Sequence, residues 1–240
     1  MMKTLVLSAV LALLGLSGAA APSEKPGTPL RFLALGDSYT IGEGLVPAER
    51  WPVQLAARLR EKGVAAGEPR IIAETGWTVA DLGEALTRAR PKGPFDLVTL
   101  QIGVNDQYQG ADPGPYRPRF AALLKRAIAL AGGHPQRVVV LSIPDWSVTP
   151  FAAETGRDRA RTAAEIERFN RIDREETERA GARWVDVTPA SRKAASDRSL
   201  LAGDGLHPSG KMYAEWVRLA LPAALGLPGK MASSPWTSVR

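Results

Sequence analysis

A serine and a histidine far apart in the sequence are the residues best suited to covalent chemistry. Ser38 lies in the segment Gly-Asp-Ser-Tyr-Thr at residues 36–40, directly after the apolar run 30–35. A serine hydroxyl attacks a carbonyl carbon only if a base takes its proton, and a histidine can do so near neutral pH. The chain has two histidines, His134 and His207. We therefore ask which of them the fold could bring to Ser38.

His207 has a carboxylate nearby in the sequence. Asp204 precedes it by three residues, close enough along a turn to accept a hydrogen bond from the imidazole and fix its tautomer. His134 follows a predicted helix, at the opposite end from the crevice that would hold Ser38, where we expect it to face solvent or to cap the helix. The alternative for Asp-x-x-His is a plain turn before a helix, with no catalytic role. The same alternative applies to Asp37 and Ser38, because both residue types are common in turns.

Attack on a carbonyl also needs hydrogen-bond donors for the oxygen that becomes negatively charged. The backbone N–H groups of Ser38 and Gly76 and the side-chain amide of Asn105 could supply them. Glycine at position 76 would let the backbone itself approach a substrate. Taken singly, Gly76 and Asn105 are unremarkable turn residues.

The elements between these residues predict the fold class. Five short apolar runs have the composition of β-strands, and amphipathic segments lie between them. The alternation predicts a three-layer α/β/α fold, flavodoxin-like, with a five-stranded parallel sheet. Right-handed crossovers would then gather Ser38, Gly76, Asn105 and the loop with His207 at one sheet edge. The predicted strands are 30–35, 70–74, 96–102, 137–143 and 183–187, and the main helices are 51–61, 79–90, 118–131, 158–180 and one from residue 209.

Four short sequence motifs, in the order in which they occur along the chain, resemble those of the SGNH hydrolases, the GDSL esterase/lipase family. They are Gly-Asp-Ser at 36–38, Gly76, Gly-x-Asn-Asp at 103–106 and Asp-x-x-His at 204–207. The chain looks most similar to single-domain bacterial secreted esterases of the thioesterase and lysophospholipase type. The resemblance implies Ser38 as nucleophile, His207 as base and Asp204 as its orienting carboxylate. It also implies an oxyanion hole of Ser38, Gly76 and Asn105, with no metal and no cofactor.

The chain departs from the family pattern at Tyr39, where the family name has leucine. It also carries a bulky residue, Trp77, beside Gly76. We expect Trp77 and Trp146 to contact the substrate, and Trp51 and Tyr108 are further candidates to line the crevice. Packing in the core or at the rim is the alternative for each of these rings.

Composition limits the compartment and the partners. The 240 residues are 45% hydrophobic, contain no cysteine and carry a formal charge of +6. Without cysteine, disulfides, thiolate metal sites and a lipoprotein anchor are excluded. The basic residues are interleaved with acids and form no dense run, which argues against nucleic-acid binding.

The first residues have the pattern of a secretory signal peptide. A basic tip, an apolar stretch too short to span a membrane comfortably and small residues near Ala20 predict a signal at residues 1–20. We expect a hydrolase domain at 29–227, a flexible tail at 228–240 and a secreted or periplasmic protein without stable membrane insertion. The sequence leaves the oligomeric state open.

The pattern predicts an exported serine esterase that hydrolyses acyl or lysophospholipid-type esters through an acyl-enzyme. Two alternatives keep the same triad, a carbohydrate O-acetylesterase and an acyltransferase that uses a sugar or lipid hydroxyl instead of water. A third alternative is a binding protein that has lost catalysis. The chain keeps residues for the nucleophile, the base, the orienting carboxylate and the oxyanion hole, which argues against this alternative.

Overall fold

The structure is a computed structural model, and it describes residues 28–226. The signal peptide predicted at 1–20 and the tail predicted at 228–240 lie outside this range.

Five parallel strands form one sheet, as the sequence predicts. Their order is β2-β1-β3-β4-β5, so β1 and β3 lie side by side near the centre. Every residue of β1, β3 and β4 is buried, which is typical of a parallel sheet covered on both faces. The strands are β1 (Phe32–Gly36), β2 (Arg70–Ala73), β3 (Leu97–Gln101), β4 (Val138–Leu141) and β5 (Arg183–Val185).

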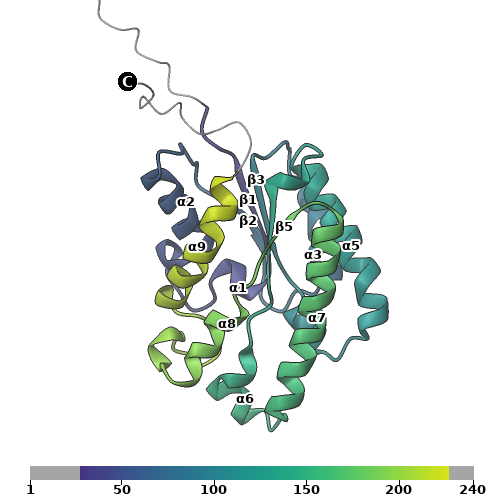
Figure 1. The fold of residues 1–240 in the computed structure, drawn as a ribbon, viewed down its shortest axis with the longest axis vertical. Coiled ribbons are helices and arrows are strands. Elements are labelled where there is room, and N and C mark those ends of the chain that lie inside the picture. The colour runs from purple at the N-terminus through teal and green to yellow at the C-terminus, as the bar shows by residue number, and fades with distance from the viewer. Residues whose placement is uncertain (1–27, 227–240) are drawn as a thin grey trace, which may run out of the picture.

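Helices cover both faces of the sheet and complete the three layers (Figure 1). On one face α2 (Trp51–Glu61) packs against α9 (Gly210–Leu225). The opposite face carries α3 (Val79–Ala89), α5 (Pro113–Leu130) and α7 (Arg159–Arg179), with α5 between the other two. The predicted α/β/α fold is confirmed.

Short helices follow the carboxyl ends of the strands and build the edge of the sheet that holds the site. The α-helices among them are α1 (Ser38–Ile41), α4 (Val104–Tyr108), α6 (Pro150–Glu154) and α8 (Thr188–Ser191). The 3-10 helices of the structure are η1 (Pro47–Glu49), η2 (Pro135–Arg137), η3 (Trp146–Val148), η4 (Arg192–Ala195) and η5 (Arg198–Leu200).

Two segments differ from the sequence prediction. α5 begins at Pro113, five residues before the expected start at Pro118, because the Asp112 side chain accepts a hydrogen bond from Gly114 N and caps the helix there. The segment 146–156, which lies outside the predicted strands and helices, forms η3 and α6. Asp145 caps η3, and Thr149 caps α6 with a proline at its first position.

The apolar core lies between the sheet and the two helical layers. Trp51 and Trp216, from α2 and α9, are among its largest fully buried side chains. Of the two alternatives for Trp51, the structure shows packing in the core, since the ring is fully buried in the layer that α2 and α9 form. Each large apolar side chain that is fully buried in such a core stabilises the fold by roughly 1.5–3 kcal/mol.

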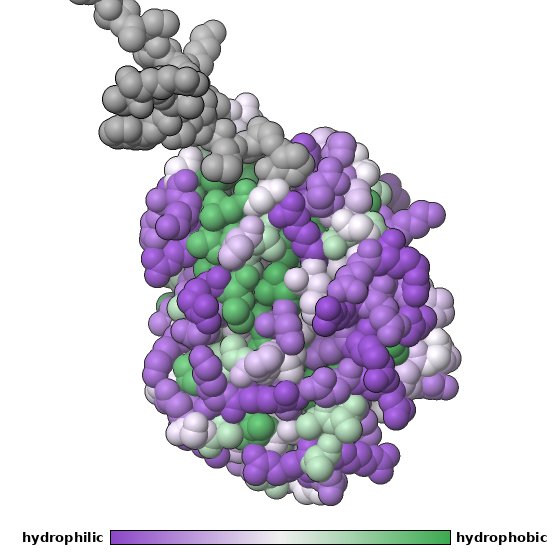
Figure 2. Space-filling view, in the orientation of Figure 1, coloured by the Kyte–Doolittle hydropathy of each residue, from purple (hydrophilic) through white to green (hydrophobic). Residues whose placement is uncertain are grey.

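The two helical layers present different surfaces. Hydrophobic residues gather over α9 in Figure 2, where Leu219, Leu221 and Leu225 are partly exposed, whereas the surface over α7 is almost wholly hydrophilic. Within residues 28–226, no helix has the combination of length and apolar character needed to cross a membrane.

Candidate active site

Ser38 lies at the first position of α1, directly after β1. Asp37 caps this helix, and its side chain accepts a hydrogen bond from Tyr39 N at 3.0 Å. The strand reaches this turn through Gly36, where an added Cβ would collide with the Thr40 side chain. A glycine is therefore required for the chain to turn this tightly, and the turn directs the Ser38 side chain towards His207.

The structure brings Ser38, His207 and Asp204 together. His207 Nε2 lies 2.9 Å from Ser38 Oγ, and Nδ1 of the same ring lies 2.6 Å from Asp204 Oδ2. Asp204 Oδ1 also accepts hydrogen bonds from Leu206 N and His207 N, each at 2.9 Å. With Nδ1–H donating to Asp204, Nε2 is left to accept the Ser38 proton. His134 lies exposed beyond the end of α5.

Asp204 is the charged member of this group. Partial burial raises its pKa, but hydrogen bonds from the His207 side chain and from Leu206 N and His207 N outweigh that effect, so the pKa of Asp204 falls below its ordinary value. The carboxylate therefore stays ionised at neutral pH and can stabilise an imidazolium formed on His207.

Donors for an oxyanion meet beside Ser38. Gly76 has a φ of +84°, a conformation that L side chains rarely adopt, and space is open where a Cβ would lie. Neither Ser38 N–H nor Gly76 N–H donates to another residue of the part that the structure describes. Asn105 Nδ2 donates one proton to the Trp77 carbonyl at 2.8 Å. Its second proton is left for a ligand.

These groups face one pocket of about 200 Å³. Its polar wall consists of Ser38, Gly76, Asn105 and His207, and its aromatic wall consists of Tyr108, Trp146 and Phe151; Tyr39, Thr75, Val104 and Leu206 complete the lining. A nucleophile, a base and three donors around a mostly apolar cavity are the parts needed for acyl transfer.

The sequence profile of the GDSL-like lipase/acylhydrolase family matches residues 34–215. The chain belongs to this family. Its members hydrolyse ester bonds, so the protein is a hydrolase of that class. A search of curated protein sequences finds no match.

Solved structures of the GDSL family share the fold. TesA aligns with a TM-score of 0.63 at 20% identity, covering 82% of this chain and 99% of that one. A lipolytic G-D-S-L family protein from Veillonella parvula aligns at 0.61 and 17% identity, covering 82% and 100%. A variant of Axe2, an acetyl xylan esterase from Geobacillus stearothermophilus, aligns at 0.58 and 19% identity, covering 87% and 99%.

Of the two tryptophans expected to contact the substrate, only Trp146 lines the pocket. Trp77 follows the positive-φ turn at Gly76, and its ring packs, half-buried, against the core. The contribution of Trp77 to this site is its carbonyl, which orients the Asn105 amide. The sequence alone shows that a large ring follows Gly76. The direction in which that ring points depends on the backbone conformation of the turn at Gly76.

The aromatic wall holds itself together by ring contacts. The centroids of Tyr108 and Trp146 lie 5.5 Å apart, those of Trp146 and Phe151 6.1 Å apart, and those of Tyr108 and Phe151 6.2 Å apart. Such pairs contribute about 0.5–1.5 kcal/mol each beyond the area they bury. Tyr108 ends α4 and Phe151 lies in α6, so two short helices far apart in sequence share this wall.

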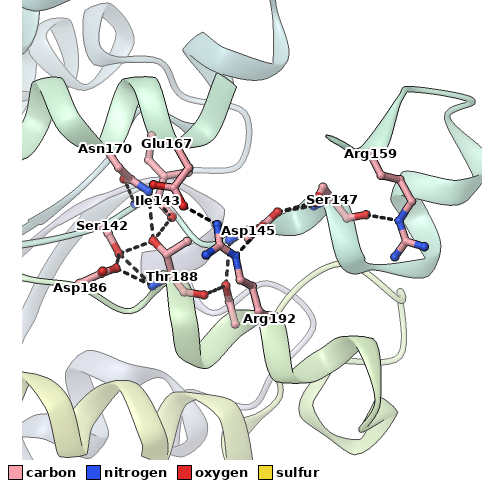
Figure 3. Close-up of polar contacts among 11 residues, drawn as sticks. Ser142, Ile143, Asp145, Ser147, Arg159, Glu167, Asn170, Asp186, Thr188 and Arg192 are labelled. Atoms are coloured by element: carbon pink, nitrogen blue, oxygen red, sulfur yellow. Dashed lines mark hydrogen bonds and ion pairs between the residues drawn. The ribbon is translucent and has the colours of Figure 1, made fainter. Parts of the chain in front are cut away.

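Polar contacts fix Trp146 from behind. Its Nε1 donates to Gln107 Oε1 at 2.9 Å. The preceding Asp145, which is 3% exposed, forms an ion pair with Arg192 at 2.8 Å, and Arg192 also pairs with Glu167 (Figure 3).

The segment after Trp146 is fixed as well. Arg159 Nε donates to the Ser147 carbonyl at 2.8 Å (Figure 3). Sequence reasoning missed Gln107 and Arg192 as supports of the site, and neither lies in a motif that indicates this role.

A buried acid lies behind the polar wall. Burial raises the pKa of Asp37 to about 8, and the nearby Asp106 carboxyl adds to the shift, while the hydrogen bond from Tyr39 N opposes it. Burial likewise raises the pKa of Asp106, which accepts a hydrogen bond from Val79 N at 2.9 Å. Asp37 is therefore mostly protonated at neutral pH, although it is the neighbour of Ser38.

The 28–226 segment has no cluster of three or more histidine, aspartate or glutamate side chains arranged to hold a metal ion.

Proposed function

We propose that the protein is an exported serine esterase that forms an acyl-enzyme on Ser38. One observation carries this proposal: Ser38 Oγ and His207 Nε2 lie at hydrogen-bond distance, and Asp204 lies at the other ring nitrogen. A nucleophile paired with a base that is itself oriented by a third group is the arrangement needed for covalent catalysis.

The reaction would proceed in two steps. Ser38 Oγ attacks the ester carbonyl carbon while its proton passes to His207 Nε2, and the carbonyl oxygen takes the negative charge. Ser38 N–H, Gly76 N–H and Asn105 Nδ2 donate to that oxygen. As the C–O bond to the alcohol breaks, His207 returns the proton to the departing oxygen. Water, activated by His207, then cleaves the acyl-enzyme and restores Ser38.

The aromatic wall supports carboxylic esters with an acyl chain longer than acetyl. Each buried methylene contributes about 0.8 kcal/mol, so binding should improve along a chain that lies against Tyr108, Trp146 and Phe151. We expect kcat/KM to increase from acetate to butyrate or hexanoate esters. A panel of p-nitrophenyl esters from acetate to palmitate, with acetylated xylan and pectin fragments alongside, tests this. Preference for acetate and for the acetylated sugars would favour a carbohydrate O-acetylesterase instead.

A fluorophosphonate probe tests the nucleophile directly. Mass spectrometry should find the probe on Ser38 in the unaltered protein and nowhere in Ser38→Ala. An unlabelled Ser38 in a folded protein would favour a binding protein. Addition of glycerol or a soluble sugar to the ester assay separates hydrolysis from acyl transfer, since a transferase would yield the new ester in place of free acid.

Export rests on the pattern of residues 1–20. Expression of the full chain in a bacterium, fractionation and mass spectrometry of the amino terminus test it. The proposal predicts a mature protein that begins at Ala21 and lies in the periplasm or the medium. An intact amino terminus in the cytoplasmic fraction would contradict it.

A further inference from the structure

A single arginine lies against the outer side of the aromatic wall. Arg157 is exposed and follows Gly156, in the turn between α6 and α7. Its guanidinium carbon lies 4.3 Å from the Tyr108 ring centroid and 5.8 Å from that of Trp146. Nη2 donates to the Tyr108 carbonyl at 2.7 Å, which fixes the guanidinium in this place. The charge therefore lies just beyond two rings that line the catalytic pocket.

Beyond Tyr108 a second cavity adjoins this arginine. Its volume is about 370 Å³, and Tyr108 borders both this cavity and the catalytic pocket. Arg157 and Arg161 line it together with Asp158 and Glu165. A substrate that extends past the aromatic wall would therefore enter a polar space.

The carboxylates that border this cavity already have partners. Asp158 caps α7 by accepting from Arg161 N at 2.7 Å. Glu165 accepts from Arg161 Nε and from Gln107 Nε2, each at 3.0 Å. By contrast, no carboxylate within residues 28–226 lies within ion-pair distance of the Arg157 guanidinium. The two arginines and two carboxylates of the lining balance in formal charge, but among the described residues Arg157 is the cation of this cavity that forms no ion pair.

A guanidinium keeps its charge at every physiological pH, and its planar set of donors matches a carboxylate or a phosphate. We propose that Arg157 binds the anionic end of the substrate, an ester that carries a carboxylate or phosphate remote from the bond that is cleaved. The proposal rests on the proposed function, because the aromatic wall would hold the apolar part between the ester and the anion. The anion could belong to the acyl chain or to the alcohol, and the experiment distinguishes the two.

Two pairs of esters isolate the anion. The first pair is p-nitrophenyl pentanoate and mono-p-nitrophenyl glutarate, which differ in a terminal carboxylate on the acyl side. The second pair is monobutyrylglycerol and butyryl glycerol 3-phosphate, which differ in a phosphate on the alcohol side. The variants are Arg157→Met and Arg157→Lys, and Arg168→Met is the control, since Arg168 is an exposed α7 residue that lines neither cavity.

We expect Arg157→Met to lower kcat/KM for the anionic ester more than for the neutral ester in at least one pair. The two losses should differ by about tenfold, which corresponds to about 1.4 kcal/mol. Arg157→Lys should recover part of this preference, and salt should weaken it. The control should keep the preference of the unaltered protein. The pair that responds identifies the side of the ester that carries the anion. Equal losses within both pairs would overturn the proposal and make Arg157 a structural support of Tyr108.

Binding keeps the proposal testable if turnover fails. Calorimetry with Ser38→Ala and with Ser38→Ala/Arg157→Met measures the affinity for the glutarate and glycerol phosphate esters without cleavage. Tighter binding to the first protein supports the role of Arg157. Equal affinities, or no binding to either protein, overturn it. If the unaltered protein cleaves none of the four esters yet binds the anionic ones through Arg157, the proposed function is at fault and the anion site stands.

Discussion

The two walls of the catalytic pocket are built in opposite ways. The polar wall depends on a backbone conformation that favours glycine, the positive φ at Gly76, and on a carboxyl kept in the interior behind it, that of Asp37. Burial of such a polar group costs stability. The aromatic wall consists of rings in mutual contact, so it stabilises the fold where it also lines the pocket.

Each wall should therefore tolerate a different kind of change. Changes in the polar wall should alter the reaction rate and leave stability almost intact, because its groups contribute little packing. Changes in the aromatic wall should alter substrate preference and stability together. Three predictions test this separation, and a fourth tests the buried acid behind the polar wall.

Ser38→Ala and His207→Ala should each lower kcat by roughly 10⁴–10⁶-fold, because the nucleophile and base act as one unit. Their melting temperatures should stay near that of the unaltered protein. His134→Ala is the matched control and should be nearly silent, since His134 lies exposed beyond α5. Equal loss of activity in His207→Ala and His134→Ala would refute the assignment of His207, and not His134, as the base.

Asn105→Ala should lower kcat by roughly 10²–10³-fold, the usual effect of one oxyanion donor. KM should change much less, because the hydrogen bond strengthens mainly in the transition state. Steady-state kinetics with p-nitrophenyl butyrate separates the two parameters. A variant that raised KM alone would make Asn105 a residue of substrate binding.

Phe151→Ala should lower kcat/KM for hexanoate esters by about 15-fold, which follows from the loss of contact with about two methylenes. The effect on acetate esters should stay within about twofold. Thermal unfolding of the same variant should show a lower melting temperature, since two ring contacts are lost. Uniform losses from acetate to hexanoate would mean that the acyl chain does not lie against this ring.

Asp37→Asn should change the pH dependence of stability. The pKa of Asp37 is about 8 in the folded protein, against an ordinary value near 3.8. The unfolded chain therefore loses this proton at lower pH than the folded chain does, so stability decreases as pH rises from about 4 to 8. The amide can still accept from Tyr39 N, but it has no proton to lose.

The melting temperature of Asp37→Asn should consequently fall less between pH 5 and pH 8 than that of the unaltered protein. For a chain of this size, a change of 1 kcal/mol in the free energy of unfolding shifts the melting temperature by about 2–4 °C. Asp197→Asn is a suitable contrast, because hydrogen bonds from Lys211 and Ser199 lower the pKa of Asp197 to about 2, and its effect should appear only at acidic pH. Parallel pH curves for Asp37→Asn and the unaltered protein would show that Asp37 is ionised in the fold.

Local sequence patterns were sufficient to predict the strands, the helices that cover the sheet and the residues that meet at its edge. Strand and helix periodicities are local properties, and the handedness of parallel crossovers places every strand-end loop on one side. Ser38, Gly76, Asn105 and the Asp204–His207 turn could therefore be predicted to meet, although they span most of the chain.

The surroundings of these residues depend on tertiary packing and could not be predicted in this way. Which side of a turn a ring faces depends on the backbone at one residue, so Trp77 turns into the core after Gly76 while Trp146 faces the pocket. The partners of Trp146 and Asp145 lie about 40 residues away or more, on α4 and η4. Contacts over such separations leave no periodic signal, because they arise when packing fixes several elements at once. The position of Arg157 over Tyr108 has the same origin.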